Sequence, residues 1–226
     1  MKKRILIIAS SANIIGPNHR STGSFLTETA HPYEAFKKQG YDIDIASVNG
    51  GEAPLDGMSE KDDEINTAFL NGDGLQKMKN TFPVSEAKIS DYDAVFIPGG
   101  LAPMVDMPDN EIIQAAIAST YERGGVVGAV CHGPVSLLNV QLADGSYLIQ
   151  GKNITAFSNA EEDNYAKEDV PFLLETALRD RESNYSSVSP WQAYSITDGR
   201  LVTGQNPASA QGVAEKMIAI LESPKS

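Results

Sequence analysis

The single cysteine of the chain, Cys131, is the residue best suited to covalent chemistry. It follows an apolar run, VVGAV at 126–130, and is followed by His132, a glycine and a proline. A nucleophile at a sharp turn between a strand and a helix projects from the carboxyl end of the strand, where open α/β sheets bind their ligands. The pattern therefore predicts a cysteine nucleophile held at such a turn.

Activation of this thiol is expected from the helix that the sequence predicts directly after Cys131. Backbone N–H groups in the first turn of a helix lack intrahelical partners, so they favour a thiolate and can later stabilise an oxyanion. We therefore expect a lowered thiol pKa. His132 would assist only if a strained turn brought its ring back to the sulfur, because neighbouring residues on a helix do not face one another.

A purely structural role is the alternative for Cys131, since free cysteines are among the most buried residues. Gly128, Gly133 and Pro134 surround it. Glycine and proline serve backbone geometry more than packing, so these neighbours favour a functional turn.

The elements that would position this turn alternate along the chain. Short runs rich in β-branched residues predict buried strands at 5–9, 43–48, 94–97 and 126–130. Helical patterns lie at 25–39, 64–69, 75–78 and 110–123, and glycine follows the first and last of them as expected for a C-terminal cap. This order predicts an α/β fold, a flavodoxin-like three-layer sandwich whose mostly parallel sheet is covered by helices on both faces.

The last third of the chain departs from this alternation of strands and helices. Gly145 and Gly151 mark tight turns, and Asp198-Gly199 between two short apolar runs predicts a β-hairpin. A closing helix is expected at about 208–221. Because an α/β chain of this length commonly holds one core, we expect residues 1–226 to form a single domain.

Charge and composition limit the classes of binding partner and the cellular compartment. The net charge of −12 disfavours binding to nucleic acid or to anionic membranes, both of which require a positive face. One cysteine allows no internal disulfide, which fits a reducing cytoplasm. No apolar run reaches the roughly 18 residues of a membrane helix, and the N-terminal run is too short for a signal peptide. We expect a cytoplasmic protein.

Cofactor sites are not expected. His19, His31 and His132 are scattered and offer no ligand pair at helical spacing, so no metal is predicted. The loop at 12–23 lacks the lysine and spacing of a phosphate-binding loop.

Several motifs resemble the ThiJ/PfpI superfamily, which shares the class I glutamine amidotransferase-like fold. Residues 129–134 (AVCHGP) are similar to its nucleophile motif. Residues 22–32, with Thr22-Gly23, Glu28 and His31-Pro32, resemble the first helix of the glutathione-independent glyoxalase III, or chaperone-like, branch. The resemblance continues through 97–100 (IPGG), 154–157 (ITAF) and the C-terminal 198–209 (DGRLVTGQNPAS), so it covers nearly the whole chain in order.

The resemblance implies a role for each matching residue. Cys131 would be the nucleophile and His132 its proton-transfer partner. Glu162 would orient and charge-balance His132, with Glu161 and Asp163 as alternatives because the three acids are consecutive. Glutamine amidotransfer itself is disfavoured, since that activity expects a histidine and a glutamate two positions apart near the C-terminus.

Further implied roles concern the pocket. Glu28 would contact the thiol and act as a second acid/base group, since a carboxylate in an apolar helix segment is costly unless it is paired or protonated. Gly99 and Gly100 would form the oxyanion and substrate-binding turn, Gly100 through its N–H. The chain departs from the branch at 101–106 (LAPMVD), where many members carry a histidine and then a tryptophan. Leu101 and Met104 therefore leave the polarity of that pocket wall open.

The implied activity is conversion of methylglyoxal or a similar small 2-oxoaldehyde to a 2-hydroxy acid, a lyase reaction of the glyoxalase III type without glutathione. The implied partners are a small-molecule aldehyde and a second copy of the chain in a homodimer. The same residues also suit a hydrolase, acting as peptidase or deglycase. A stress-related holding chaperone or a redox sensor is the alternative from another class.

Overall fold

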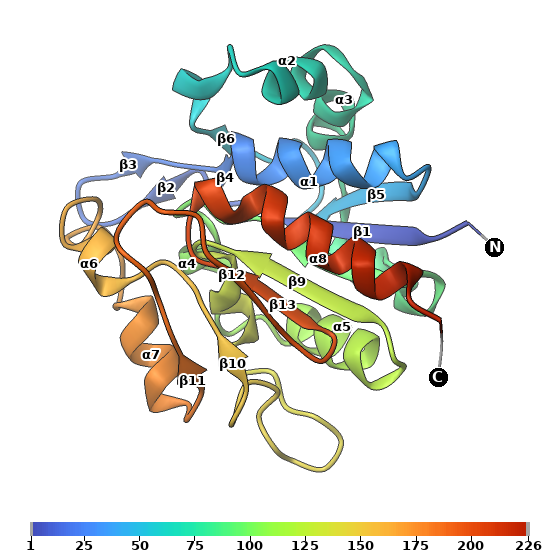
Figure 1. Cartoon of the computed structure of the whole chain (residues 1–226). Coiled ribbons are helices and arrows are strands. Elements are labelled where there is room, and N and C mark those ends of the chain that lie inside the picture. The colour runs from blue at the N-terminus through green and yellow to red at the C-terminus, as the bar shows by residue number, and fades with distance from the viewer. Residues whose placement is uncertain (1, 225–226) are drawn as a thin grey trace.

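A seven-stranded sheet runs through the computed structural model, which describes residues 2–224 (Figure 1). In spatial order the strands are β12 (Ser195–Asp198), β13 (Leu201–Gly204), β9 (Val126–Val130), β8 (Ala94–Ile97), β1 (Arg4–Ala9), β5 (Asp42–Ser47) and β7 (Phe82–Pro83). Neighbouring strands are parallel except β12 and β13, which form the predicted hairpin. The sequence prediction of a mostly parallel sheet is confirmed.

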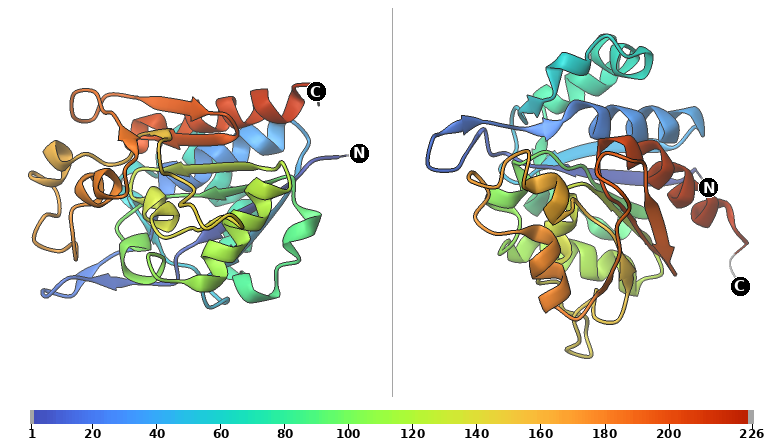
Figure 2. Two further views of the ribbon diagram at one scale, coloured as in Figure 1. Left: turned by 90° about the horizontal axis from the view of Figure 1, so that it is seen from below. Right: turned by 60° about the vertical axis from the view of Figure 1, so that its left-hand side comes forward.

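Helices cover both faces of this sheet. The long helices α1 (Leu26–Lys38) and α8 (Ala210–Glu222) lie on one face, and α5 (Glu111–Glu122) lies on the other (Figure 2). Alternate residues of a strand point to opposite faces. In β1, accordingly, Ile5 and Ile7 belong to the core under α1 and α8, whereas Leu6 and Ile8 belong to the core under α5. The predicted three layers are confirmed, and burial on both faces explains the continuous apolar run.

Smaller elements surround the carboxyl ends of the strands. The remaining helices are α2 (Glu64–Asn71), α3 (Asp73–Lys79), α4 (Pro103–Asp106), α6 (Asn159–Glu162) and α7 (Leu174–Asp180). Short strands pair as β2 (Ile14–Ile15) with β3 (Arg20–Ser21), β4 (Ser24–Phe25) with β6 (Leu55–Asp56), and β10 (Asn153–Ile154) with β11 (Asn184–Tyr185). The 3-10 helices are η1 (Met58–Glu60), η2 (Val84–Glu86), η3 (Ile89–Asp91), η4 (Gly133–Leu137) and η5 (Pro207–Ser209).

The segment after Cys131 differs from its prediction. Instead of an α-helix it forms the short 3-10 helix η4. Its N–H groups donate to the carbonyl three residues earlier, Val135 to His132 over 3.1 Å and Leu138 to Val135 over 3.2 Å, which is the tighter 3-10 pattern. No long helix therefore follows the thiol, and any stabilisation of its thiolate by the backbone must come from individual N–H groups.

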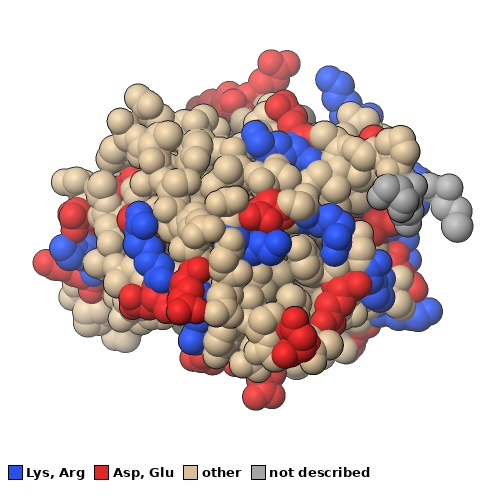
Figure 3. All heavy atoms as spheres, turned by 60° about the horizontal axis from the view of Figure 1, so that its bottom comes forward, with Lys and Arg blue, Asp and Glu red and all other residues tan. Residues whose placement is uncertain are grey.

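Surface charges are mixed on the face shown in Figure 3, where acidic and basic side chains alternate without forming a basic patch. Within residues 2–224, no helix is both long and apolar enough to cross a membrane.

Candidate active site

Cys131 lies in a strained turn at the carboxyl end of β9. Its backbone φ is +60°, which costs free energy for a side chain with a Cβ and is tolerated only where the surroundings hold it. Its N–H donates to the Gly204 carbonyl and its own carbonyl accepts from the Phe157 N–H, both over 2.9 Å. This conformation places the His132 Nδ1 atom 3.4 Å from the Cys131 sulfur. The strained turn that the sequence required for His132 to take part is present.

A carboxylate completes the arrangement behind the imidazole. His132 Nε2 lies 2.6 Å from Glu162 Oε2, and both side chains are buried. With Glu162 as a carboxylate, Nε2 carries the hydrogen and Nδ1 is left as an acceptor facing the sulfur. Cys131, His132 and Glu162 are therefore arranged so that a proton can leave the thiol.

The neighbours of Glu162 have other partners. Asp163 pairs with Lys167 over 2.6 Å at the surface. Glu161 is fully buried and accepts hydrogen bonds from Ser158, Gln205, Asn206 and the Trp191 N–H. Of the three consecutive acids, only Glu162 contacts the imidazole.

Glu28 approaches the thiol from the first turn of α1. The carboxyl is fully buried, and Oε2 accepts from the Gly99 N–H over 2.7 Å. Its other oxygen, Oε1, has no hydrogen-bond partner among the described residues. Burial raises the pKa of Glu28 to about 8, against the opposing effect of its contacts with Cys131 and Gly99. At neutral pH this carboxyl therefore carries a proton, which it can donate toward the sulfur or a substrate.

The resting thiol also carries its proton. Burial raises the pKa of Cys131, and a charged Glu28 raises it further, whereas the backbone N–H groups of Gly100 and His132 act in the opposite direction. The predicted lowering of the thiol pKa is therefore wrong, because desolvation outweighs two amides where no long helix follows. The Cys131 proton must be removed during catalysis, and the acceptor that faces it is His132 Nδ1.

The two glycines of the predicted oxyanion turn play different parts. Gly100, with φ at +85°, lines the pocket beside Cys131, and its backbone N–H acts to lower the pKa of the thiol. The Gly99 N–H donates to Glu28 and is not free to bind a substrate oxygen, so the role predicted for Gly99 is corrected to holding Glu28 in place. A Cβ at Gly99 would lie 2.3 Å from Glu28 Oε2 and 2.8 Å from the Cys131 Cβ, so no larger residue fits there.

Gly99→Ala is expected to displace the Glu28 carboxyl and to lower the free energy of unfolding by about 1–3 kcal/mol, the usual cost of overpacking. Urea unfolding together with turnover would measure both effects. Gly51→Ala is the control, because Gly51 has a left-handed backbone but a Cβ added there would meet nothing within 4 Å, so only stability should fall. A Gly99 variant with wild-type stability and turnover would contradict this geometry.

These groups open into one pocket of about 520 Å³. The lining includes Glu28, Gly100, Cys131 and His132, together with Arg20, Phe25, Asp56, Glu60, Phe157, Tyr165, Trp191 and Asn206. The sulfur is thus neither sealed in apolar packing nor far from acid/base groups. Leu101 and Met104 are buried in the core, and no residue of 101–106 lines this pocket, so the side chains of that segment form no part of its wall.

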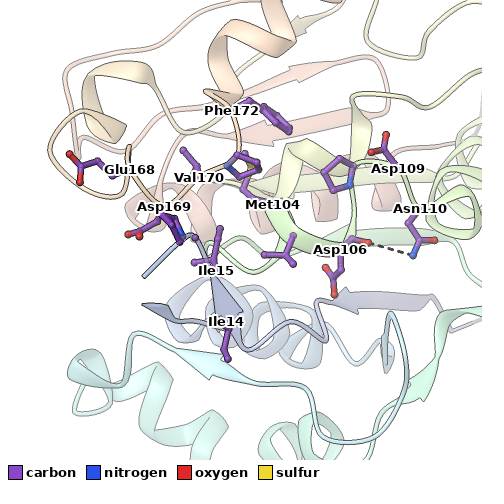
Figure 4. Close-up of a pocket in the computed structure, with 15 residues that line it drawn as sticks. Ile14, Ile15, Met104, Asp106, Asp109, Asn110, Glu168, Asp169, Val170 and Phe172 are labelled. Atoms are coloured by element: carbon purple, nitrogen blue, oxygen red, sulfur yellow. Dashed lines mark hydrogen bonds between the residues drawn. The ribbon is translucent and has the colours of Figure 1, made fainter. Parts of the chain in front are cut away.

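A larger hollow, of about 800 Å³, lies elsewhere (Figure 4). Ile15, Met104 and Phe172 line it, with carboxylates on either side. One of these, Asp106, accepts from Ser10 and Ser11. Neither cysteine nor histidine lines it among the described residues, so the smaller pocket holds the candidate chemistry.

Sequence reasoning missed two aromatic residues of the cysteine pocket, Tyr165 and Trp191. The only available signal was that Trp191 is the sole tryptophan of the chain. Residues 2–224 hold no group of three or more His, Cys, Asp and Glu side chains arranged to bind a metal ion. The absence of a cofactor remains a prediction.

Comparison with known proteins identifies the relatives of this chain. The model of the DJ-1/PfpI family matches residues 22–220. Glyoxalase 3 of Candida albicans is 32% identical over 240 residues, which cover 98% of this chain and 99% of that protein. Glutathione-independent glyoxalase HSP31 of Saccharomyces cerevisiae is 34% identical over 239 residues, covering 98% of both.

Solved structures agree over nearly the whole length. Rapid Encystment Protein 24 KDa of Francisella tularensis has a TM-score of 0.93 at 37% identity, covering 98% of this chain and 100% of that one. Glyoxalase III of Candida albicans has a TM-score of 0.88 at 32% identity, covering 96% and 97%. The resemblance to the ThiJ/PfpI superfamily and its glyoxalase III branch is confirmed.

Proposed function

The chain belongs to the DJ-1/PfpI family, and from this premise and the surroundings of Cys131 we propose that it is a glutathione-independent glyoxalase. It converts a 2-oxoaldehyde such as methylglyoxal to the 2-hydroxy acid. The observation that carries the proposal is the convergence of a thiol, an imidazole and a protonated carboxyl on one pocket: Cys131, His132 and Glu28 all line it. The relatives named as glyoxalases, which match at full length, support it.

The reaction balances without an external oxidant or reductant. His132 Nδ1 takes the thiol proton, and the sulfur adds to the aldehyde carbon to form a hemithioacetal. A base then removes the proton from that carbon, a proton is delivered to the neighbouring carbonyl carbon, and the hydroxyl proton of the hemithioacetal passes to the neighbouring oxygen. The first carbon is thereby oxidised to a thioester and the second is reduced to an alcohol. Water hydrolyses the thioester, which releases the 2-hydroxy acid and restores the Cys131 thiol.

Two groups are placed to move the proton between the carbons. Glu28, with its pKa raised to about 8 by burial, can both give and take a proton near neutral pH. His132 is held in one orientation by Glu162, which also balances the charge of the imidazolium. The backbone N–H groups of Gly100 and His132, which favour the thiolate form of Cys131, are suited to an oxygen anion formed beside it.

Pure protein is expected to consume methylglyoxal without added glutathione or metal, and to release lactate in equal amount. The assay should follow the aldehyde by absorbance and the acid by chromatography, with peptide amides and glycated peptides as parallel substrates. Hydrolysis of those substrates without lactate formation would instead favour a hydrolase. Failure to consume any 2-oxoaldehyde, by protein shown to be folded, would overturn the proposal.

The domain organisation, cellular compartment and oligomeric state of the protein are also proposed. We expect the chain to act as a single domain in the cytoplasm and as a homodimer, and sedimentation velocity would measure the assembly.

A further inference from the structure

Three aromatic rings form one wall of the cysteine pocket, which we call the aromatic wall: Phe157, Tyr165 and Trp191. Their ring centroids lie 5.5–5.9 Å apart, and each pair meets edge to face. Phe157 also lies 4.4 Å from the His132 ring, centroid to centroid. The aromatic wall therefore adjoins the candidate catalytic groups.

Trp191 is fixed in this wall although its side chain is half exposed. The residue is 49% exposed, and its backbone φ of +67° is strained for a bulky residue. Its backbone N–H donates over 2.8 Å to the buried carboxylate of Glu161, which also accepts from the Asn206 side-chain amide over 2.9 Å. The Asn206 amide in turn donates to the Gln192 carbonyl over 2.7 Å. A buried carboxylate thus holds the loop in a conformation that displays the indole at the pocket.

The size of the pocket exceeds what a three-carbon aldehyde requires. A benzene ring fits a cavity of about 150 Å³, whereas this pocket measures about 520 Å³. The volume therefore accommodates a dicarbonyl group at the sulfur and a ring against the aromatic wall.

The charges of the pocket favour a neutral substituent. Asp56 and Glu60 line it, and their carboxylates would repel an anionic group. Among the residues that the structure describes, the one cation that lines it is Arg20, which pairs with Asp169 over 3.1 Å and lies over the Tyr165 ring at 4.8 Å. An apolar ring is not repelled by these carboxylates and does not need Arg20 as a partner.

We infer that Trp191, with Tyr165 beside it, is a specificity-determining residue that binds the substituent of the 2-oxoaldehyde, so that the site takes arylglyoxals such as phenylglyoxal. This inference rests on the proposed function and adds the substrate class. The ring of the substrate packs edge to face against the indole, a contact that the methyl group of methylglyoxal cannot make. The overall reaction is unchanged: phenylglyoxal and water give mandelate.

The test compares kcat/KM for phenylglyoxal and methylglyoxal in the wild type and in Trp191→Ala. The ratio of the two values is expected to fall roughly three- to tenfold in the variant, mainly through KM for phenylglyoxal. Trp191→Phe should restore part of the ratio. Val188→Ala is the matched control, because Val188 belongs to the same loop and is exposed but does not line the pocket, and it should keep the wild-type ratio.

Inhibition of the wild type supplies a measurement that needs no variant. Mandelate is expected to inhibit methylglyoxal turnover more tightly than lactate, by a similar factor. An equal loss for both aldehydes in Trp191→Ala, or equal inhibition by both acids, would overturn the inference and leave the glyoxalase proposal standing. If the folded wild type consumes neither aldehyde, the glyoxalase proposal itself fails.

Discussion

Cys131→Ala is expected to abolish conversion of 2-oxoaldehydes, with a loss of about 10⁴-fold or more in kcat. The covalent route has no substitute, because Cys131 is the only cysteine of the chain and no other thiol can form the hemithioacetal. Cys131→Ser tests the same point at nearly constant shape, since a hydroxyl at this position is a much weaker nucleophile.

The fold should survive both substitutions. The backbone of residue 131 is held by hydrogen bonds to Gly204 and Phe157 that do not involve the sulfur. Circular dichroism and urea unfolding should therefore show native structure, with a change of about 1 kcal/mol or less in the free energy of unfolding. Turnover of methylglyoxal at the wild-type rate in a folded Cys131→Ala sample would exclude the nucleophile role.

Glu28→Gln is expected to lower kcat by about 10²- to 10⁴-fold, because the amide keeps the shape of the side chain but cannot exchange a proton. In the wild type, activity should fall as pH rises through about 8, where Glu28 loses its proton. The residual activity of the variant should lack this step. Asp106→Asn is the matched control: this largely buried carboxyl also has a raised pKa, due first to burial, but it lies outside the cysteine pocket.

The same substitution has a predicted effect on stability. The folded-state pKa of Glu28 is raised from 4.5 to about 8, so between these values the folded protein holds a proton that the unfolded chain releases. Stability is therefore lost as pH rises from about 4.5 through about 8, by up to about 5 kcal/mol for this group. Glu28→Gln should remove that loss.

Urea unfolding of both proteins at pH 5 and pH 8 would measure the difference. As pH rises from 5 to 8, the free energy of unfolding of Glu28→Gln is expected to increase relative to that of the wild type by a few kcal/mol. A constant difference across this range would show that Glu28 is ionised in the folded protein, and it would contradict its role as a proton donor at neutral pH.

The sequence by itself determined the layered fold and the position of the nucleophile. Strands buried on both faces read as continuous apolar runs, so 5–9, 94–97 and 126–130 could be placed almost to the residue. The glycine and proline around Cys131 indicated a special turn, because their effect on the backbone is local. The C-terminal hairpin was equally visible, since Asp198-Gly199 specifies its own turn.

Only the tertiary structure decided what surrounds the sulfur. Glu28 reaches Gly99 across 71 positions of sequence and also contacts the thiol, and Glu162 could be separated from Glu161 only by seeing which carboxylate meets His132. The shift of the thiol pKa is opposite to the predicted one for the same reason. Desolvation and neighbouring charge depend on groups that the folded chain brings together, and no local pattern contains them. The aromatic wall with Trp191 arises in this way too, because its rings come from three separate segments.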